Sequence, residues 1–418
     1  MQTKISQYLI NGIKTHIIEI PTLDLTYAQV VYRRGVIYDE PNKLGLAHFF
    51  EHIWGTKTKY WQNDLEKSLY IEKKGIIKNA YTERLLVYHY GKQDSSNLIE
   101  SIQIIDELVK NGEINQDDFI SEKKVVIQEK EDSKYDEYDK KIELIYIGNS
   151  LSQNVFGNVE DIELQDVLDF NKQYFSLENA NMVILTPDIE IIKNSELKIE
   201  PTLIKPIPLE DEFFNWEKNI DNAIEFNLVS IDTENVNVSL NFVYKNSLSQ
   251  KEIWTLYLLR NIIANYWSSY LVKRLRLQER LVYWVDSYID DNPQASNFSI
   301  EYKVSKENLE KTLDILQDML ANLEFDNEIL DQIKNLFLID SKIYYSSINN
   351  LAEFYRDQLR NNLVIEYKVE DYWNFVKITT VEDLDNIVKK VLSPRNKMLL
   401  INGKLTKYSC KSNNLRYN

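Results

Sequence analysis

Alternating apolar and polar residues predict a β-sheet at the start of the chain. Residues Lys4 to Ile10 and Lys14 to Ile20 flank Asn11-Gly12, a pair that favours the tight turn of a β-hairpin. The stretch from Leu25 to Arg33 predicts a further strand. Other predicted elements of this half are helices at 44–54, 98–109 and 117–131 and strands at 76–81 and 85–90. Strands and helices mix without regular alternation, which indicates an α+β class with mainly antiparallel sheet.

The two halves of the chain resemble each other. Leu164 to Leu185 and Val381 to Ile401 each combine an amphipathic helix, a short break that contains asparagine, and an apolar strand. A weaker match joins the helical stretch before Glu129 to the one before Asp340. We therefore expect two homologous α+β domains, each a sheet covered by helices.

A proline-rich stretch lies near the middle of the chain. Pro201, Pro206 and Pro208 fall close together, and proline favours an extended connector because it fixes φ and lacks an N–H. A chain of 418 residues is also too long for one compact core. We predict a first domain over 1–200, a linker over 201–218 and a second domain over 219–418.

Composition excludes several classes of protein. The net charge of −16 disfavours binding to nucleic acid, and the 44% of hydrophobic residues excludes a mostly disordered chain. The single cysteine, Cys410, excludes an intramolecular disulfide and a zinc site made of cysteines. The first residues lack the features of a signal peptide or presequence, and no apolar stretch reaches the roughly 18 residues of a membrane helix. We expect a bacterial cytoplasmic protein without a membrane partner.

One pentapeptide offers metal chemistry, His48-Phe49-Phe50-Glu51-His52. On a helix, positions i, i+3 and i+4 share a face, so both histidines and the glutamate project together while the phenylalanines turn toward the core. Two imidazoles one turn apart can share a zinc ion, with the glutamate beside it. The alternative is a coincidental pair of histidines, and two ligands alone leave the site incomplete.

The residues alone do not identify the third zinc ligand. Glu122 and Glu129 lie two turns apart on one face of a predicted helix, but if this helix stood alone, a solvated acidic face would be the favoured interpretation. The two other histidines, His16 and His89, lie in strand-like segments, and we assign them to structure or surface.

The chain resembles the pitrilysin/insulinase family of inverted zinc metallopeptidases, which includes the mitochondrial processing peptidases. His-x-x-Glu-His is the signature of that family, and Gly45 to His52 resembles its surroundings, as do Asn11-Gly12 and the segment from Gly35 to Pro41. The resemblance implies one Zn²⁺ per chain, held by both histidines and by Glu129. It also implies a second functional glutamate at Glu122.

Two further segments carry the resemblance. Asn79-Ala80-Tyr81-Thr82 resembles the family's edge strand, which holds the substrate backbone. Leu275-Arg276 and Leu281-Val282-Tyr283 resemble a segment of the second half, and Arg276 and Tyr283 keep its spacing. Without that spacing, Arg276 is a surface cation and Tyr283 a packing residue. The chain departs from the family at Lys74-Gly75, where a glycine pair is usual, and at Arg280, where one glycine is usual.

The resemblance implies a zinc metalloendopeptidase that hydrolyses peptides or unfolded polypeptide segments. Glu51 would take a proton from a water held by the zinc and pass it to the leaving amine, and Glu122 would orient a ligand. Tyr283 would stabilise the oxyanion and Arg276 would contact a substrate carbonyl. Asn79 and Ala80 would pair with the peptide as an added β-strand.

Members of this family enclose substrate between two clam-like halves, each built from two α+β domains. A chain of 418 residues supplies one half, so we expect a homodimer, or else a heterodimer with a related subunit. The alternatives are a dedicated maturation protease for one leader or precursor peptide, and a non-catalytic scaffold subunit of a heterodimer.

Overall fold

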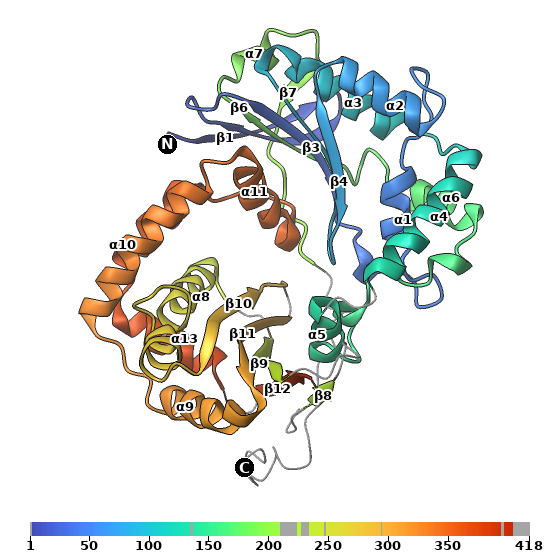
Figure 1. The fold of residues 1–418 in the computed structure, drawn as a ribbon. Coiled ribbons are helices and arrows are strands. Elements are labelled where there is room, and N and C mark those ends of the chain that lie inside the picture. The colour runs from blue at the N-terminus through green and yellow to red at the C-terminus, as the bar shows by residue number, and fades with distance from the viewer. Residues whose placement is uncertain are drawn as a thin grey trace. The chain divides into compact units, whose positions relative to one another are not determined.

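The computed structural model describes residues 2–133, 137–209, 224–226, 234–245, 248–293, 295–393 and 397–403. They form two compact units (Figure 1). The first comprises Met1–Lys134, Gly148–Phe213 and Tyr344–Glu370, and the second comprises Tyr135–Ile147, Phe214–Ile343 and Asp371–Asn418. The end of the predicted linker, 210–218, lies outside the described residues. Both units are discontinuous in sequence, and the predicted domain boundaries stay a prediction.

The first unit is built on a seven-stranded sheet in the order β4-β5-β3-β6-β2-β1-β7. Its strands are β1 (Lys4–Ile10), β2 (Ile13–Glu19), β3 (Thr26–Tyr32), β4 (Ile77–Thr82), β5 (Val87–Gln93), β6 (Asn181–Thr186) and β7 (Ile199–Pro201). All neighbouring pairs are antiparallel except β2 and β6. Among the described strands, β4 has a partner on one side only and is therefore an edge strand.

The predicted hairpin is confirmed. Strands β1 and β2 pair in antiparallel fashion up to Ile10 opposite Ile13. Asn11 and Gly12 form the turn with φ of 52° and 93°. Two consecutive positive φ angles give the turn that matches the twist of the strands, which is why Asn-Gly is favoured there.

Helices cover both faces of this sheet (Figure 1). The helices of the first unit are α1 (Leu46–Ile53), α2 (Asp64–Lys73), α3 (Leu98–Asn111), α4 (Gln116–Ser133), α6 (Leu164–Tyr174), α7 (Glu190–Lys193) and α11 (Ile348–Asn362). Ile17, Val30 and Ile184 point from one face into a core shared with α1 and α3. Side chains alternate along a strand, so their neighbours, including His16, point to the other face, against which α11 packs.

The second unit holds a five-stranded sheet in the order β10-β11-β9-β12-β8. Its strands are β8 (Ile224–Phe226), β9 (Asn235–Lys245), β10 (Val282–Asp290), β11 (Ala295–Ser305) and β12 (Lys397–Asn402). Its helices include α5 (Glu137–Ile145), α8 (Gln250–Ile263), α9 (Leu309–Ala321), α10 (Asn327–Tyr344), α12 (Val369–Ile378) and α13 (Val381–Val391). None of the described helices combines the length and apolar character that a membrane span needs.

The two sheets repeat one arrangement. The order β10-β11-β9-β12-β8 corresponds strand by strand to β4-β5-β3-β6-β2. Strand β6 lies antiparallel to β3 and parallel to β2, and β12 lies antiparallel to β9 and parallel to β8. The helices α6 and α13 precede β6 and β12, as the matching sequence segments predict. The α+β class with two related domains is confirmed.

Candidate metal centre

A residue of the preceding loop caps the N-terminus of helix α1. The carboxylate of Asp39 accepts the backbone N–H of Gly45 at 2.8 Å and that of Ala47 at 3.0 Å. Gly45 has a φ of 91°, and a Cβ atom there would lie 2.2 Å from a backbone oxygen of Phe156. Glycine is therefore required at this position. The two phenylalanines of the pentapeptide are fully buried, as predicted, whereas His48 and His52 face Glu129 of α4.

The structure brings His48, His52 and Glu129 together. Their ligand atoms lie within 4.8 Å of one another, the one such group of three among the described residues. Glu129 Oε2 lies 3.8 Å from His48 Nε2 and 3.5 Å from His52 Nε2. Ligands on a tetrahedral zinc ion are about 3.4 Å apart, given bonds of about 2.1 Å. The two imidazoles and the carboxylate therefore fit a zinc ion with little movement.

Glu122 lies behind His52 rather than in the ligand group. Its Oε2 is 3.3 Å from His52 Nδ1, so Nδ1–H donates to the carboxylate and Nε2 is left facing Glu129. Burial opposes a charge on His52, but the hydrogen bond to Glu122 and the surrounding carboxylates raise its pKa. Burial lowers the pKa of His48 to about 3, which keeps its Nε2 lone pair available to a metal.

Glu51 lies between the two histidines on α1 and borders a cavity of about 270 Å³. Its Oε2 accepts a hydrogen bond from Thr82 Oγ1 at 3.1 Å. Burial raises the pKa of Glu51. His52, Glu122, Asn79 and Ala80 also border this cavity, and its apolar wall consists of Trp54, Ile71, Ile76, Ile104, Ile105 and Leu108. The carboxylate of Glu51 and the metal-binding side chain of His52 therefore lie beside one cavity with an apolar wall.

Asn79 and Ala80 lie on the edge strand. In the register of β4 and β5, Asn79 lies opposite Tyr90 and Ala80 opposite His89. The N–H of Ala80 donates to the side-chain oxygen of Asn79 at 2.9 Å, so it does not bond to β5. This amide faces the open edge of the sheet, where another strand can pair with it.

Arg276 and Tyr283 meet in the second unit. Arg276 lies in a π-helical turn, Val272–Gln278, and its guanidinium carbon is 5.3 Å from the ring centre of Tyr283 and 4.4 Å from that of Trp267. A register shift between β10 and β11 falls between Val282 and Val285 and so includes Tyr283, which is 80% exposed. π-turns and bulges of this kind often occur at functional sites, where they aim side chains outward.

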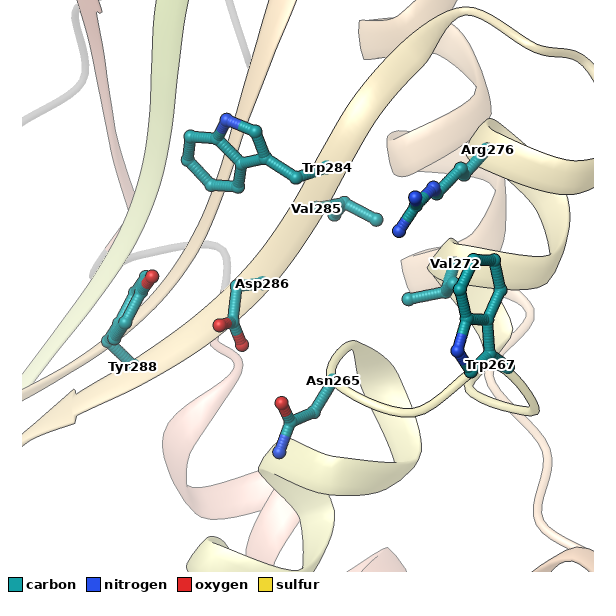
Figure 2. A pocket seen from close by; sticks show the side chains of 8 residues that line it. All are labelled: Asn265, Trp267, Val272, Arg276, Trp284, Val285, Asp286 and Tyr288. Atoms are coloured by element: carbon teal, nitrogen blue, oxygen red, sulfur yellow. The ribbon is translucent and has the colours of Figure 1, made fainter.

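Arg276 also borders a pocket of about 370 Å³ in this unit (Figure 2). The residues around it are mainly aromatic or charged: Asn265, Trp267, Val272, Arg276, Trp284, Val285, Asp286 and Tyr288. Arg280, which precedes β10, has a φ of 55°. That left-handed conformation favours glycine, the residue that the family resemblance leads us to expect at this position.

Two neighbours of the predicted residues were not predicted from the sequence, Thr82 and Trp267. Thr82 belongs to the segment Asn79-Ala80-Tyr81-Thr82, but no sequence pattern indicates its hydrogen bond to Glu51. The two remaining histidines lie inside the first unit. His16 is fully buried, and its Nε2 accepts the N–H of Ile365 at 3.3 Å, whereas the His89 ring lies 4.7 Å from that of Trp54.

The chain is similar to known proteins in sequence and in fold. Residues 16–156 match the family model Insulinase (Peptidase family M16), and residues 161–337 match the model Peptidase M16 inactive domain. An uncharacterized zinc protease of Rickettsia bellii is 24% identical over 404 residues, which cover 91% of this chain and 90% of that protein. The human mitochondrial-processing peptidase subunit beta is 25% identical over 143 residues, 32% of this chain and 29% of that protein. The crystal structure of a Helicobacter pylori protease has the same fold, with a TM-score of 0.78, 19% identity, and coverage of 96% of this chain and 100% of that chain.

Proposed function

Because this chain belongs to the insulinase family of peptidases, family M16, we propose that it is a zinc metallopeptidase that hydrolyses peptides or unfolded polypeptide segments. One observation carries the proposal: His48, His52 and Glu129 converge beside Glu51, at a cavity bordered by an open edge strand. Residues 161–337, which match the inactive-domain model, contain no histidine, so the histidine ligands of the proposed zinc ion come from residues before this match.

His48, His52 and Glu129 would hold the zinc ion. When bound, zinc polarises the scissile carbonyl and lowers the pKa of the attacking water. Glu51 would take a proton from the attacking water and deliver it to the leaving amine. Its raised pKa suits this double task, because a carboxyl group with a pKa closer to neutrality both accepts and returns a proton more readily.

The substrate would bind as a strand added to β4. The outward N–H of Ala80 supports this mode, because main-chain bonds along an open edge bind any extended peptide and leave selectivity to pockets. Without a peptide, the side chain of Asn79 accepts the N–H of Ala80. It would give up this hydrogen bond when a peptide binds. The cavity beside Glu51 would then take one substrate side chain.

Arg276 and Tyr283 would complete the site. The exposed Tyr283 hydroxyl would donate to the oxyanion, and Arg276 would contact a neighbouring substrate carbonyl. We further propose that the chain acts as a dimer, a homodimer in the simplest case, in which the pair serves the metal centre of its own chain or of the partner.

Zinc content and peptide cleavage test the proposal together. We expect one zinc per chain, cleavage of a quenched fluorescent peptide by the wild type, and loss of cleavage in Glu51→Gln with zinc retained. Glu107→Gln is a matched control, because Glu107 is a buried glutamate of the first unit outside the site. Absence of zinc would contradict the proposal and favour a scaffold. Cleavage by Glu51→Gln at the wild-type rate would refute the role of Glu51.

A further inference from the structure

The last residue of the edge strand contacts Glu51. Thr82 ends β4, and its hydroxyl donates to Glu51 Oε2 at 3.1 Å. Among the described residues, no hydrogen bond to the other oxygen, Oε1, is present. One oxygen of the carboxylate is therefore anchored, and the other is left to face a reactant. A hydroxyl that donates in this way also favours the ionised form of the carboxylate.

The residue after Thr82 is held by helix α11. Glu83 Oε1 lies 3.1 Å from Arg356 Nη2, and its Oε2 pairs with Arg360. Asp357 Oδ1 bridges the two guanidinium groups at 3.4 and 3.2 Å. We refer to these four residues as the Glu83 cluster.

The Glu83 cluster is rigidly supported. The guanidinium carbon of Arg356 lies 4.0 Å from the ring centre of Tyr88, and Arg356 is only 6% exposed. Burial opposes a charge on Glu83, but the two guanidinium groups lower its pKa, so the pairs are between full charges. The N–H of Glu83 also donates to Leu86 O at 2.7 Å, which fixes the backbone of the turn.

We propose that Thr82 is a positioning residue for Glu51, and that the Glu83 cluster holds Thr82 in place. The inference rests on the proposed function of Glu51. Consecutive Cα atoms are a fixed distance of about 3.8 Å apart, so a displacement of the Glu83 backbone away from α11 would be passed on to the backbone of Thr82. A displacement of about 1 Å at a reacting group is enough to cost about 100-fold in rate.

A merely structural role for Thr82 predicts a different result from a positioning role. Thr82→Val keeps the shape of the side chain and removes the O–H. We expect kcat to fall about 10- to 100-fold with KM and zinc content unchanged. Thr82→Ser restores the donor and should return most of kcat. Thr26→Val is the matched control, because Thr26 donates to Gln93 O at 3.1 Å in the same sheet, and its loss should leave kcat unchanged.

The Glu83 cluster is tested through coupling. Glu83→Gln removes the negative charge that pairs with both arginines. We expect it to lower kcat, as Thr82→Val does. If the cluster acts through Thr82, the double variant Thr82→Val/Glu83→Gln should lose no more than the larger single loss. Losses that multiply would overturn the link. So would an unchanged kcat in Glu83→Gln.

Crystal structures of the wild type and Thr82→Val test the positioning role without an activity measurement. We expect one position of the Glu51 carboxylate in the wild type and several in the variant. Loss of cleavage in Glu51→Gln with full kcat in Thr82→Val would overturn this inference and leave the proposed function standing. If Glu51→Gln keeps activity, the proposed role of Glu51 fails, and an unchanged carboxylate in the Thr82→Val crystal would then overturn the positioning role as well.

Discussion

The buried histidine of strand β2 makes stability depend on pH. His16 is fully buried on the face of the sheet covered by the segment Tyr344–Glu370, and its Nε2 accepts the N–H of Ile365. An imidazole nitrogen can accept a hydrogen bond only while it lacks a proton. Burial accordingly lowers the pKa of His16 from 6.5 to about 4. We predict that protonation of His16 in the unfolded chain destabilises the fold in acid.

The size of the effect follows from the two pKa values. The folded pKa lies below the unfolded one, so the unfolded state binds the proton first, and stability is full above pH 6.5 and declines as pH falls toward 4. The difference of about 2.5 units, at about 1.4 kcal/mol per unit, amounts to about 3 kcal/mol. His16→Gln offers an acceptor oxygen that does not titrate in this range.

Urea unfolding of both proteins between pH 7 and pH 4 measures the effect. The free energy of unfolding of the wild type should fall by about 3 kcal/mol relative to that of His16→Gln over this interval, whatever the variant costs at pH 7. Parallel curves for the two proteins would refute the reasoning, because they would show that His16 titrates alike in the folded and unfolded chain. The NMR titration of the ring gives its folded pKa directly.

Three other changes test the site. Glu122→Gln should weaken zinc binding about 10- to 100-fold in a chelator competition, and unchanged affinity would exclude its role behind His52. Tyr283→Phe should lower kcat by at least about 10-fold with zinc content intact, whereas a change in KM alone would assign Tyr283 to substrate binding. Ala80→Pro removes the outward N–H of the edge strand and should raise KM, and an unchanged KM would exclude strand addition at that residue.

Local patterns made much of the fold predictable. The hairpin at Asn11-Gly12 and the helix that carries the two histidines follow from turn chemistry and periodicity within a few residues. The bulge at Tyr283 and the π-turn around Arg276 could not be predicted, because each depends on how β10 meets its neighbours in space. The arginine side chain gives no sign of the positive φ of Arg280, and only the glycine that is usual there in the family points to it.

Some residues of the site could be predicted from the sequence and others could not. His48, Glu51 and His52 lie within one turn of a helix, so the sequence alone places them on one face. Glu129 was chosen from many acidic residues only through the family resemblance, and the structure places it next to both histidines. Thr82 could not be predicted as a neighbour of Glu51, because their contact joins two segments far apart in the sequence.

The insertion of Tyr344–Glu370 into the first unit has a consequence for synthesis on the ribosome. His16 leaves the ribosome 349 residues before Ile365, whose N–H it accepts in the folded protein. At about 5–20 residues per second, His16 emerges roughly 20 to 70 seconds before the segment that covers it. The N-terminal half is therefore exposed to chaperones and proteases for most of translation, and it acquires its final stability only near the end of synthesis.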